Sequence, residues 1–155
     1  MFRFMLFALL FTVSSVALAG QSRYVDAINY PSDEASWDRF YDLADRLDKS
    51  FDFICGDTFC EGDYGNLRSM NFTCSVDRLS GTMGECLWTF AGGYENVDGK
   101  SGEVVSYARI FSCRAPLAPH TPVEAFYAAL EGRNPIDETL PGTQTTIYEG
   151  LTDCL

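Results

Sequence analysis

Three stretches in the middle of the chain alternate apolar and polar residues with the period of two that is typical of a half-buried β-strand. They span residues 66–76, 85–91 and 104–113. Turn-forming residues separate them, at 77–84 between the first two and at 92–102 between the last two. The pattern predicts two β-hairpins and therefore a three-stranded antiparallel meander.

The centre of each turn predicts which residues face each other. A first hairpin centred on Ser80 places Cys74 opposite Cys86, and Phe72 opposite Trp88. Because a slip of one residue would send every one of these side chains to the other face of the sheet, the register is a strong constraint.

A second hairpin centred on residues 99–100 places Cys86 opposite Cys113 and Trp88 opposite Phe111. One face then carries the aromatic residues expected in the core: Phe72, Trp88, Phe90 and Phe111. The other face is small and mixed, and it is either solvated or a docking platform. It consists of Ser69, Asn71, Thr73, Ser75, Leu87, Thr89, Val104, Ser106, Ala108, Ile110 and Ser112.

A helical pattern precedes the meander, while residues 20–31 show no sustained period and are expected to form an extended, partly mobile arm. The helix opens at 32–34, and its oppositely charged pairs Asp42/Arg46 and Asp45/Lys49 lie four residues apart. Its apolar stripe is expected to pack on the sheet, with a ligand groove as the alternative. The stripe consists of Trp37, Phe40, Tyr41, Ala44, Leu47, Phe51 and Ile54.

Two shorter helices are predicted after the meander. Residues 121–124 and 146–149 each have the Thr-x-x-Glu spacing of a capping box, although a strand over 143–148 competes with the second. The order of elements predicts an α+β domain. It comprises an N-terminal amphipathic helix, a three-stranded antiparallel meander, and one or two short C-terminal helices on one face, held by disulfides.

The N-terminus reads as a secretory signal peptide over residues 1–19, with a basic start, an apolar run and a small-residue cleavage site at 17–19. The apolar run is short for a bilayer span, so an uncleaved anchor is the less favoured alternative. Residues 20–155 are enough for a single exported domain. We expect a periplasmic or secreted protein with no transmembrane segment after cleavage.

All six cysteines lie in the part expected to be exported, where disulfides form readily. Local spacing favours Cys55–Cys60, the register favours Cys74–Cys86, and elimination leaves Cys113–Cys154. A zinc or redox site is disfavoured because the four-residue gap in the first pair is not that of zinc ribbons or thioredoxin-like motifs.

The formal net charge of −11 disfavours nucleic-acid binding, because a phosphate backbone requires a basic surface. Such acidity steers cationic partners toward a protein, although it also simply keeps a secreted protein soluble. A basic protein is therefore the expected class of partner. The sequence leaves the oligomeric state open.

The segment after the long helix is a candidate binding loop. Three carboxylates, Asp57, Glu61 and Asp63, lie near Asn66, and the cysteine pair at 55 and 60 brackets the start of the loop. A calcium site is an alternative, but the spacing departs from the EF-hand loop, so we expect no metal. A purely structural connector is the other alternative.

No specific catalytic motif is found, and no cofactor is expected. His120, the only histidine, lies in a proline-rich loop before a helix; a Ser-His-Asp or Cys-His site would have to use it, and the chain has no G-x-S-x-G nucleophile elbow. The leading hypothesis is an exported, non-catalytic binding protein, such as an inhibitor or immunity-type factor for a cationic protein. The alternatives are a small secreted hydrolase using carboxylates of the 57–63 loop, and a structural envelope protein.

Overall fold

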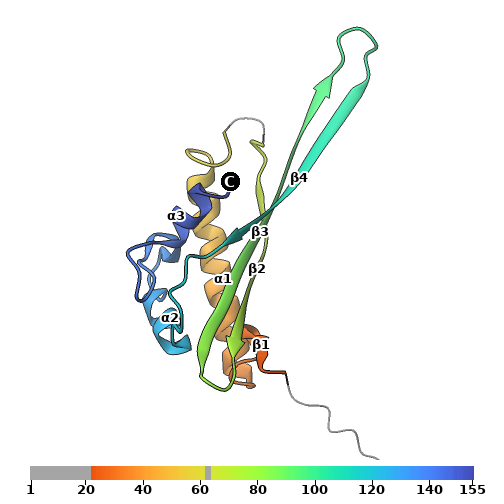
Figure 1. Ribbon diagram of the computed structural model, residues 1–155. Coiled ribbons are helices and arrows are strands. Elements are labelled where there is room, and N and C mark those ends of the chain that lie inside the picture. The colour runs from red at the N-terminus through yellow and green to blue at the C-terminus, as the bar shows by residue number, and fades with distance from the viewer. Residues whose placement is uncertain (1–21, 62–63) are drawn as a thin grey trace, which may run out of the picture.

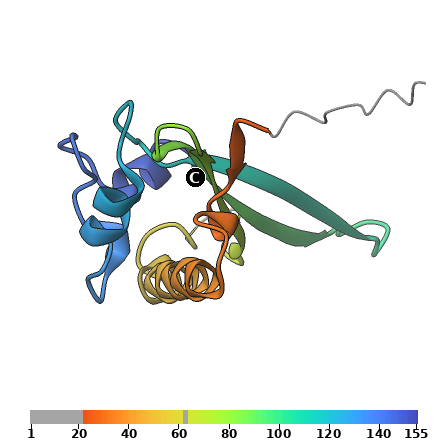
Figure 2. The same cartoon turned by 90° about the horizontal axis from the view of Figure 1, so that it is seen from below.

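One antiparallel sheet, in the order β1-β2-β3-β4, carries the helices on one of its faces (Figures 1 and 2). The computed structural model describes residues 22–61 and 64–155, so the expected signal peptide lies outside the described part. The strands are β1 (Tyr24–Asp26), β2 (Arg68–Asp77), β3 (Thr82–Val97) and β4 (Val104–Arg114). The helices are α1 (Glu34–Cys55), α2 (Val123–Ala129) and α3 (Ile147–Thr152), with 3-10 helices η1 (Ala27–Asn29) and η2 (Pro135–Asp137). The predicted α+β class is confirmed.

The sheet has a fourth strand that the pattern does not predict. β1 pairs with the end of β2, placing Tyr24 opposite Asp77 and Asp26 opposite Ser75. The prediction of a mobile arm is therefore wrong for residues 24–29, and the long helix is not the first element. Three residues are too few to show an alternating pattern, which is why this strand is missed.

An ion pair fastens the start of β1 to the end of β2. The Arg23 guanidinium donates from Nε and Nη2 to Asp77 Oδ2, at 2.8 and 2.6 Å. Asp77 is 4 % exposed, and its other carboxylate oxygen accepts from the backbone N–H of Leu79 at 3.0 Å. The Asp77 carboxylate thus holds β1 and the following turn together.

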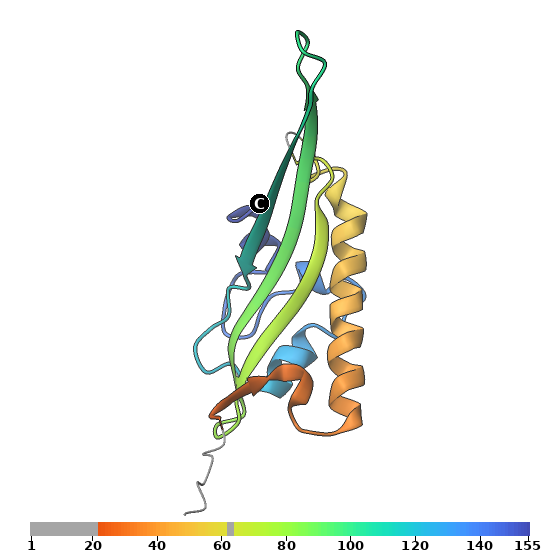
Figure 3. The same cartoon turned by 90° about the vertical axis from the view of Figure 1, so that its right-hand side faces the viewer.

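Helix α1 lies along the sheet (Figure 3) and buries a stripe that differs from the predicted one. Phe40, Leu47 and Phe51 are buried as expected, but Trp37 and Tyr41 are 52 % and 57 % exposed. The buried stripe consists of Ser36, Phe40, Leu43, Leu47, Ser50, Phe51 and Cys55. Ser36 and Ser50 are polar, so the hydrophobic pattern does not mark them as buried. The predicted stripe is therefore shifted around the helix toward Trp37 and Tyr41.

The first hairpin has the predicted register over residues 71–74, and a register shift between Cys74 and Val76 displaces the pairs next to the turn. Phe72 lies opposite Trp88, and Cys74 opposite Cys86. A bulge between Ser69 and Asn71 breaks the alternation at the start of β2, and Met70 is 62 % exposed there.

The second hairpin is displaced by two residues from its predicted register. Trp88 lies opposite Cys113, and Phe90 opposite Phe111, so the predicted pairs of Cys86 with Cys113 and of Trp88 with Phe111 are wrong. Because the displacement is even, every side chain keeps its predicted face.

The displacement reflects a turn centred one residue later than predicted, and the glycine pair predicted for this turn lies in a strand. Gly92 and Gly93 belong to β3 and not to a turn, and the chain reverses at residues 98–103. A Cβ on Gly93 would lie 2.6 Å from the carbonyl oxygen of Tyr107, and one on Gly92 would lie 2.9 Å from Leu67 Cδ2. These glycines permit close packing within the sheet, a role that their composition does not distinguish from turn formation.

The two short helices match the prediction unequally. At α3 the capping box between Thr146 and Glu149 is present, and the competing strand is reduced to a single bridge between Thr139 and Thr146. At α2 the predicted capping box is wrong, because Pro122 is the N-cap and no side chain caps the helix. Thr121 instead donates from Oγ1 to the carbonyl of Ala118 at 2.8 Å.

The three predicted cysteine pairs all lie at disulfide distance. The Cα atoms are 5.0 Å apart in Cys55–Cys60, 4.0 Å in Cys74–Cys86 and 5.5 Å in Cys113–Cys154. In the residues that the structure describes, no helix combines the length and apolarity needed to cross a bilayer. The cysteine pairing fits the expected export.

We expect Asp77→Asn to make folding less sensitive to acid. The hydrogen bond from Arg23 is the main cause that lowers the pKa of Asp77, aided by backbone N–H groups and opposed by burial. An aspartate in the unfolded chain has a pKa of about 3.9. The stabilisation from the Arg23–Asp77 contact is therefore complete above about pH 5 and is lost as the pH falls below about 4.

Urea denaturation between neutral and acidic pH measures this effect. The free energy of unfolding should fall less steeply on acidification in the variant than in the wild type. Asp153→Asn, at an exposed position, is the control. If the free energy of unfolding fell equally steeply with pH in Asp77→Asn and the wild type, Asp77 would not be a source of the acid sensitivity.

Candidate functional site

The predicted binding loop is held to the core by Phe59, while its carboxylates at Asp57 and Glu61 are exposed. Phe59 packs against Phe51 and Tyr148, with ring centroids 5.9 and 5.5 Å apart. Asp57 and Glu61 are both exposed, whereas Asp63 lies outside the described residues.

Asn66, the fourth predicted residue of this loop, has a structural contact. Its Oδ1 accepts a hydrogen bond from the backbone N–H of Gly93 at 2.7 Å, which ties the loop to β3. Over residues 22–61 and 64–155, no three His, Cys, Asp or Glu side chains gather as a metal site would require. The carboxylates available for a partner are therefore those of Asp57 and Glu61.

A larger acidic surface lies on the outer side of α1. The sequence patterns did not predict this surface. Residues three and four apart share one face of a helix, and acidic residues recur at this spacing on the side turned away from the sheet. We call them the acidic face; all are exposed, and they are Glu34, Asp38, Asp42, Asp45, Asp48 and Asp52. The spacing of three and four residues between these acidic residues is the only feature of the sequence that indicates this surface.

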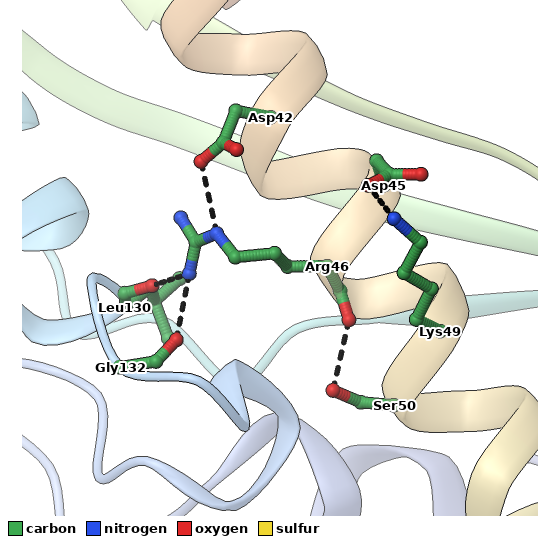
Figure 4. Close-up of polar contacts among 7 residues, drawn as sticks. All are labelled: Asp42, Asp45, Arg46, Lys49, Ser50, Leu130 and Gly132. Atoms are coloured by element: carbon green, nitrogen blue, oxygen red, sulfur yellow. Dashed lines mark hydrogen bonds and ion pairs between the residues drawn. The ribbon is translucent and has the colours of Figure 1, made fainter.

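Cations of the same protein neutralise part of the acidic face. Lys49 Nζ lies 2.5 Å from Asp45 Oδ2, as predicted, and this hydrogen bond raises the pKa of Lys49 (Figure 4). Arg68 lies 4.0 Å from Asp52. Within the described part of the chain, Glu34, Asp38 and Asp48 form no ion pair.

Arg46 neutralises Asp42 and also fixes α1 to the C-terminal segment (Figure 4). Its Nε donates to Asp42 Oδ2 at 2.9 Å, as predicted, and its Nη1 donates to the carbonyls of Leu130 and Gly132 at 2.6 and 2.8 Å. These carbonyls follow the end of α2, where a helix leaves backbone oxygens without partners. The middle of the acidic face therefore has a structural role, and its N-terminal end remains free.

Exposed aromatic rings accompany the free carboxylates at that end. Trp37 and Tyr41 form an edge-to-face pair with ring centroids 6.4 Å apart, and the Trp37 indole donates to Asn29 Oδ1 at 3.3 Å. The indole borders a surface hollow of about 480 Å³, which we call the Trp37 hollow. It is lined by Asn29, Ser32, Asp33, Glu34 and Trp37.

The electrostatics of the Trp37 hollow suit a cation. Asp33 is the N-cap of α1, and its carboxylate accepts from Oγ and N of Ser36, which lowers its pKa below the ordinary value. Asp33 therefore stays ionised at neutral pH, next to the exposed carboxylate of Glu34. A π-face beside two carboxylates offers both an ion pair and a cation–π contact to a lysine or arginine side chain.

His120 is not part of this surface. It is exposed, has a φ of 61°, and lies in the loop before α2. Among the described residues its imidazole makes no hydrogen bond or ion pair, so the structure does not assemble a Ser-His-Asp arrangement around it there.

Comparison with known proteins identifies no relative: no family model, no curated protein and no solved structure matches the chain.

We expect Arg46→Ala to lower the free energy of unfolding by about 2 kcal/mol, because it removes charged hydrogen bonds to two carbonyls as well as an ion pair. Lys49→Ala is the matched control, since it breaks only an exposed ion pair and should cost less than about 0.5 kcal/mol. Guanidinium denaturation of both variants measures the difference. Equal losses would show that the carbonyl contacts contribute nothing.

Proposed function

We propose that the protein is an exported, non-catalytic binding protein for a cationic protein, acting as an inhibitor or immunity-type factor. The observation that carries this proposal is the Trp37 hollow, which an exposed tryptophan lines together with Asp33 and Glu34, two acidic residues that form no ion pair within the described part of the chain. Interface hot spots are enriched in tryptophan and tyrosine, and charged residues typically form the rim around them.

A lysine or arginine side chain of the partner would enter this hollow. Its cation would lie over the Trp37 ring and pair with Glu34, while Asp38 would contact a second basic residue one turn further along α1. Tyr41, 57 % exposed, would extend the apolar contact. Such a contact combines an aromatic anchor with a charged rim.

The charge of the whole chain supports the same class of partner. A net charge of −11 attracts a basic protein over distances of about a Debye length and raises its rate of association. Asp57 and Glu61 are exposed in the loop that follows the C-terminal end of α1, so they add acidic side chains at the other end of the helix. The predicted binding loop is thus a second contact region within one proposed interface.

A matched pair of variants tests the proposal. The site variant Glu34→Gln/Trp37→Ala/Asp38→Asn removes two carboxylates and one exposed apolar side chain. The control Leu79→Ala/Glu131→Gln/Asp153→Asn removes the same number of each at exposed positions outside α1. The oxidised protein and both variants are immobilised, exposed to an envelope extract, and eluted with a salt gradient for mass spectrometry.

We expect the wild type and the control to retain the same basic protein, released only at high salt. The dissociation constant of that purified protein should rise about tenfold or more for the site variant and stay within about twofold for the control. Equal affinity for both variants would refute the proposed surface. Turnover of saccharide or peptide substrates, lost in Asp57→Asn/Glu61→Gln, would favour the hydrolase instead.

A further inference from the structure

The outer half of the β3–β4 hairpin extends past the rest of the sheet (Figures 1 and 3). β2 ends its pairing where Arg68 lies opposite Ala91, whereas β3 and β4 remain paired as far as Val97 and Val104. Residues beyond this point form a two-stranded ribbon without a third strand. An isolated ribbon of this kind is only marginally stable in water.

The ribbon exposes apolar side chains and an open strand edge. β4 has a strand partner on one side only, so along its other edge alternate residues direct their N–H and C=O groups to solvent. Val97, Val104 and Ile110 are each more than 60 % exposed. Exposed apolar edges of this length form sites for pairing with another strand.

Although β4 carries Arg109 and Arg114, its first five residues lack the usual features that prevent such pairing. Its pairing with β3 runs from Val97–Val104 to Leu87–Arg114 without a bulge. Residues 104–108 contain no charge and no proline. Lysine, proline or a bulge would be expected on an edge that must stay unpaired.

The charges flanking this segment are self-complementary. Glu103 lies three residues before Ser106, directly ahead of β4, and Arg109 lies three residues after Ser106, on the same face of the hairpin as Phe111. In the described part of the chain neither side chain forms an ion pair, and the Arg109 guanidinium lies 4.4 Å from the centre of the Phe111 ring. An acid and a base placed symmetrically about one residue fit a two-fold axis.

We propose that two copies of the chain pair through their β4 edges, antiparallel and centred on Ser106, to form one continuous sheet. Glu103 of each copy then faces Arg109 of the other, and Val105 faces Tyr107. Branched and aromatic residues facing each other across strands are favourable pairs, as are opposite charges. The same residues supply both halves of the interface, which is why a second copy fits this edge better than an unrelated strand.

This inference is independent of the proposed function. The contacts lie on the hairpin beyond Ala91, whereas the Trp37 hollow lies at the N-terminal end of α1, far along the opposite direction of the sheet (Figure 3). Loss of the dimer would leave that hollow intact, and loss of partner binding would leave the dimer intact.

A charge exchange tests the register directly. The purified, oxidised protein is studied by sedimentation velocity from micromolar to near-millimolar concentration, together with Glu103→Arg, Arg109→Glu and the double exchange. Each single variant places like charges opposite each other twice per dimer, so the dissociation constant should rise about tenfold or more. The double exchange restores both ion pairs and should return the constant to within about threefold of the wild type.

Lys100→Glu, at the exposed tip, changes the charge as much as Arg109→Glu does and should leave the constant unchanged. Circular dichroism of every variant checks that the fold is intact. A wild type that stays monomeric over the whole concentration range would overturn the proposal. So would a dimer that the single variants leave unweakened, or one that the double exchange fails to restore.

Discussion

The contact between α1 and the aromatic face of the sheet is the interaction on which the rest of the structure depends. Phe51 is fully buried, and its ring centroid lies 4.6 Å from that of Phe90 and 5.8 Å from that of Trp88. About three turns closer to the N-terminus of the helix, Phe40 stacks on Phe72 with ring centroids 6.1 Å apart. Large rings buried at this density supply much of the hydrophobic free energy that a small domain has.

This contact gives the protein a core on one side of its sheet only. α2 and α3 add to the same side, and the Cys113–Cys154 pair joins the last helix to β4. The opposite face and the outer hairpin receive no such cover, so their apolar side chains remain exposed. Both surfaces to which we assign binding, the outer side of α1 and the free edge of β4, lie outside this core.

Sequence patterns predicted the parts of the fold that this core determines. The first hairpin's register follows from alternation, and the even displacement of the second left its faces correct because Phe90 and Phe111 both have to be buried. The cysteine pairing followed from spacing, register and elimination, even though Cys113 does not lie opposite Cys86 as predicted.

Other features required knowledge of packing in three dimensions. Gly92 and Gly93 have the composition of a turn, but they lie in a strand because side chains would collide there. Trp37 has the hydrophobicity of a core residue, yet serines on the neighbouring side of the helix are buried in its place. For the candidate site, the sequence identified the exposed Asp57 and Glu61, but the Trp37 hollow depends on the turn from η1 into α1, which no local pattern specifies.

The most direct test of the one-sided core compares two phenylalanines of α1 that lie two residues apart. Phe51 is fully buried and Phe53 is 88 % exposed, so the pair controls for residue type and helix propensity. In equilibrium denaturation we expect Phe51→Ala to lower the free energy of unfolding by about 3–5 kcal/mol. Phe53→Ala should change it by less than about 0.5 kcal/mol. A loss below about 1 kcal/mol for Phe51→Ala, or equal losses for both, would contradict a fold held by this contact.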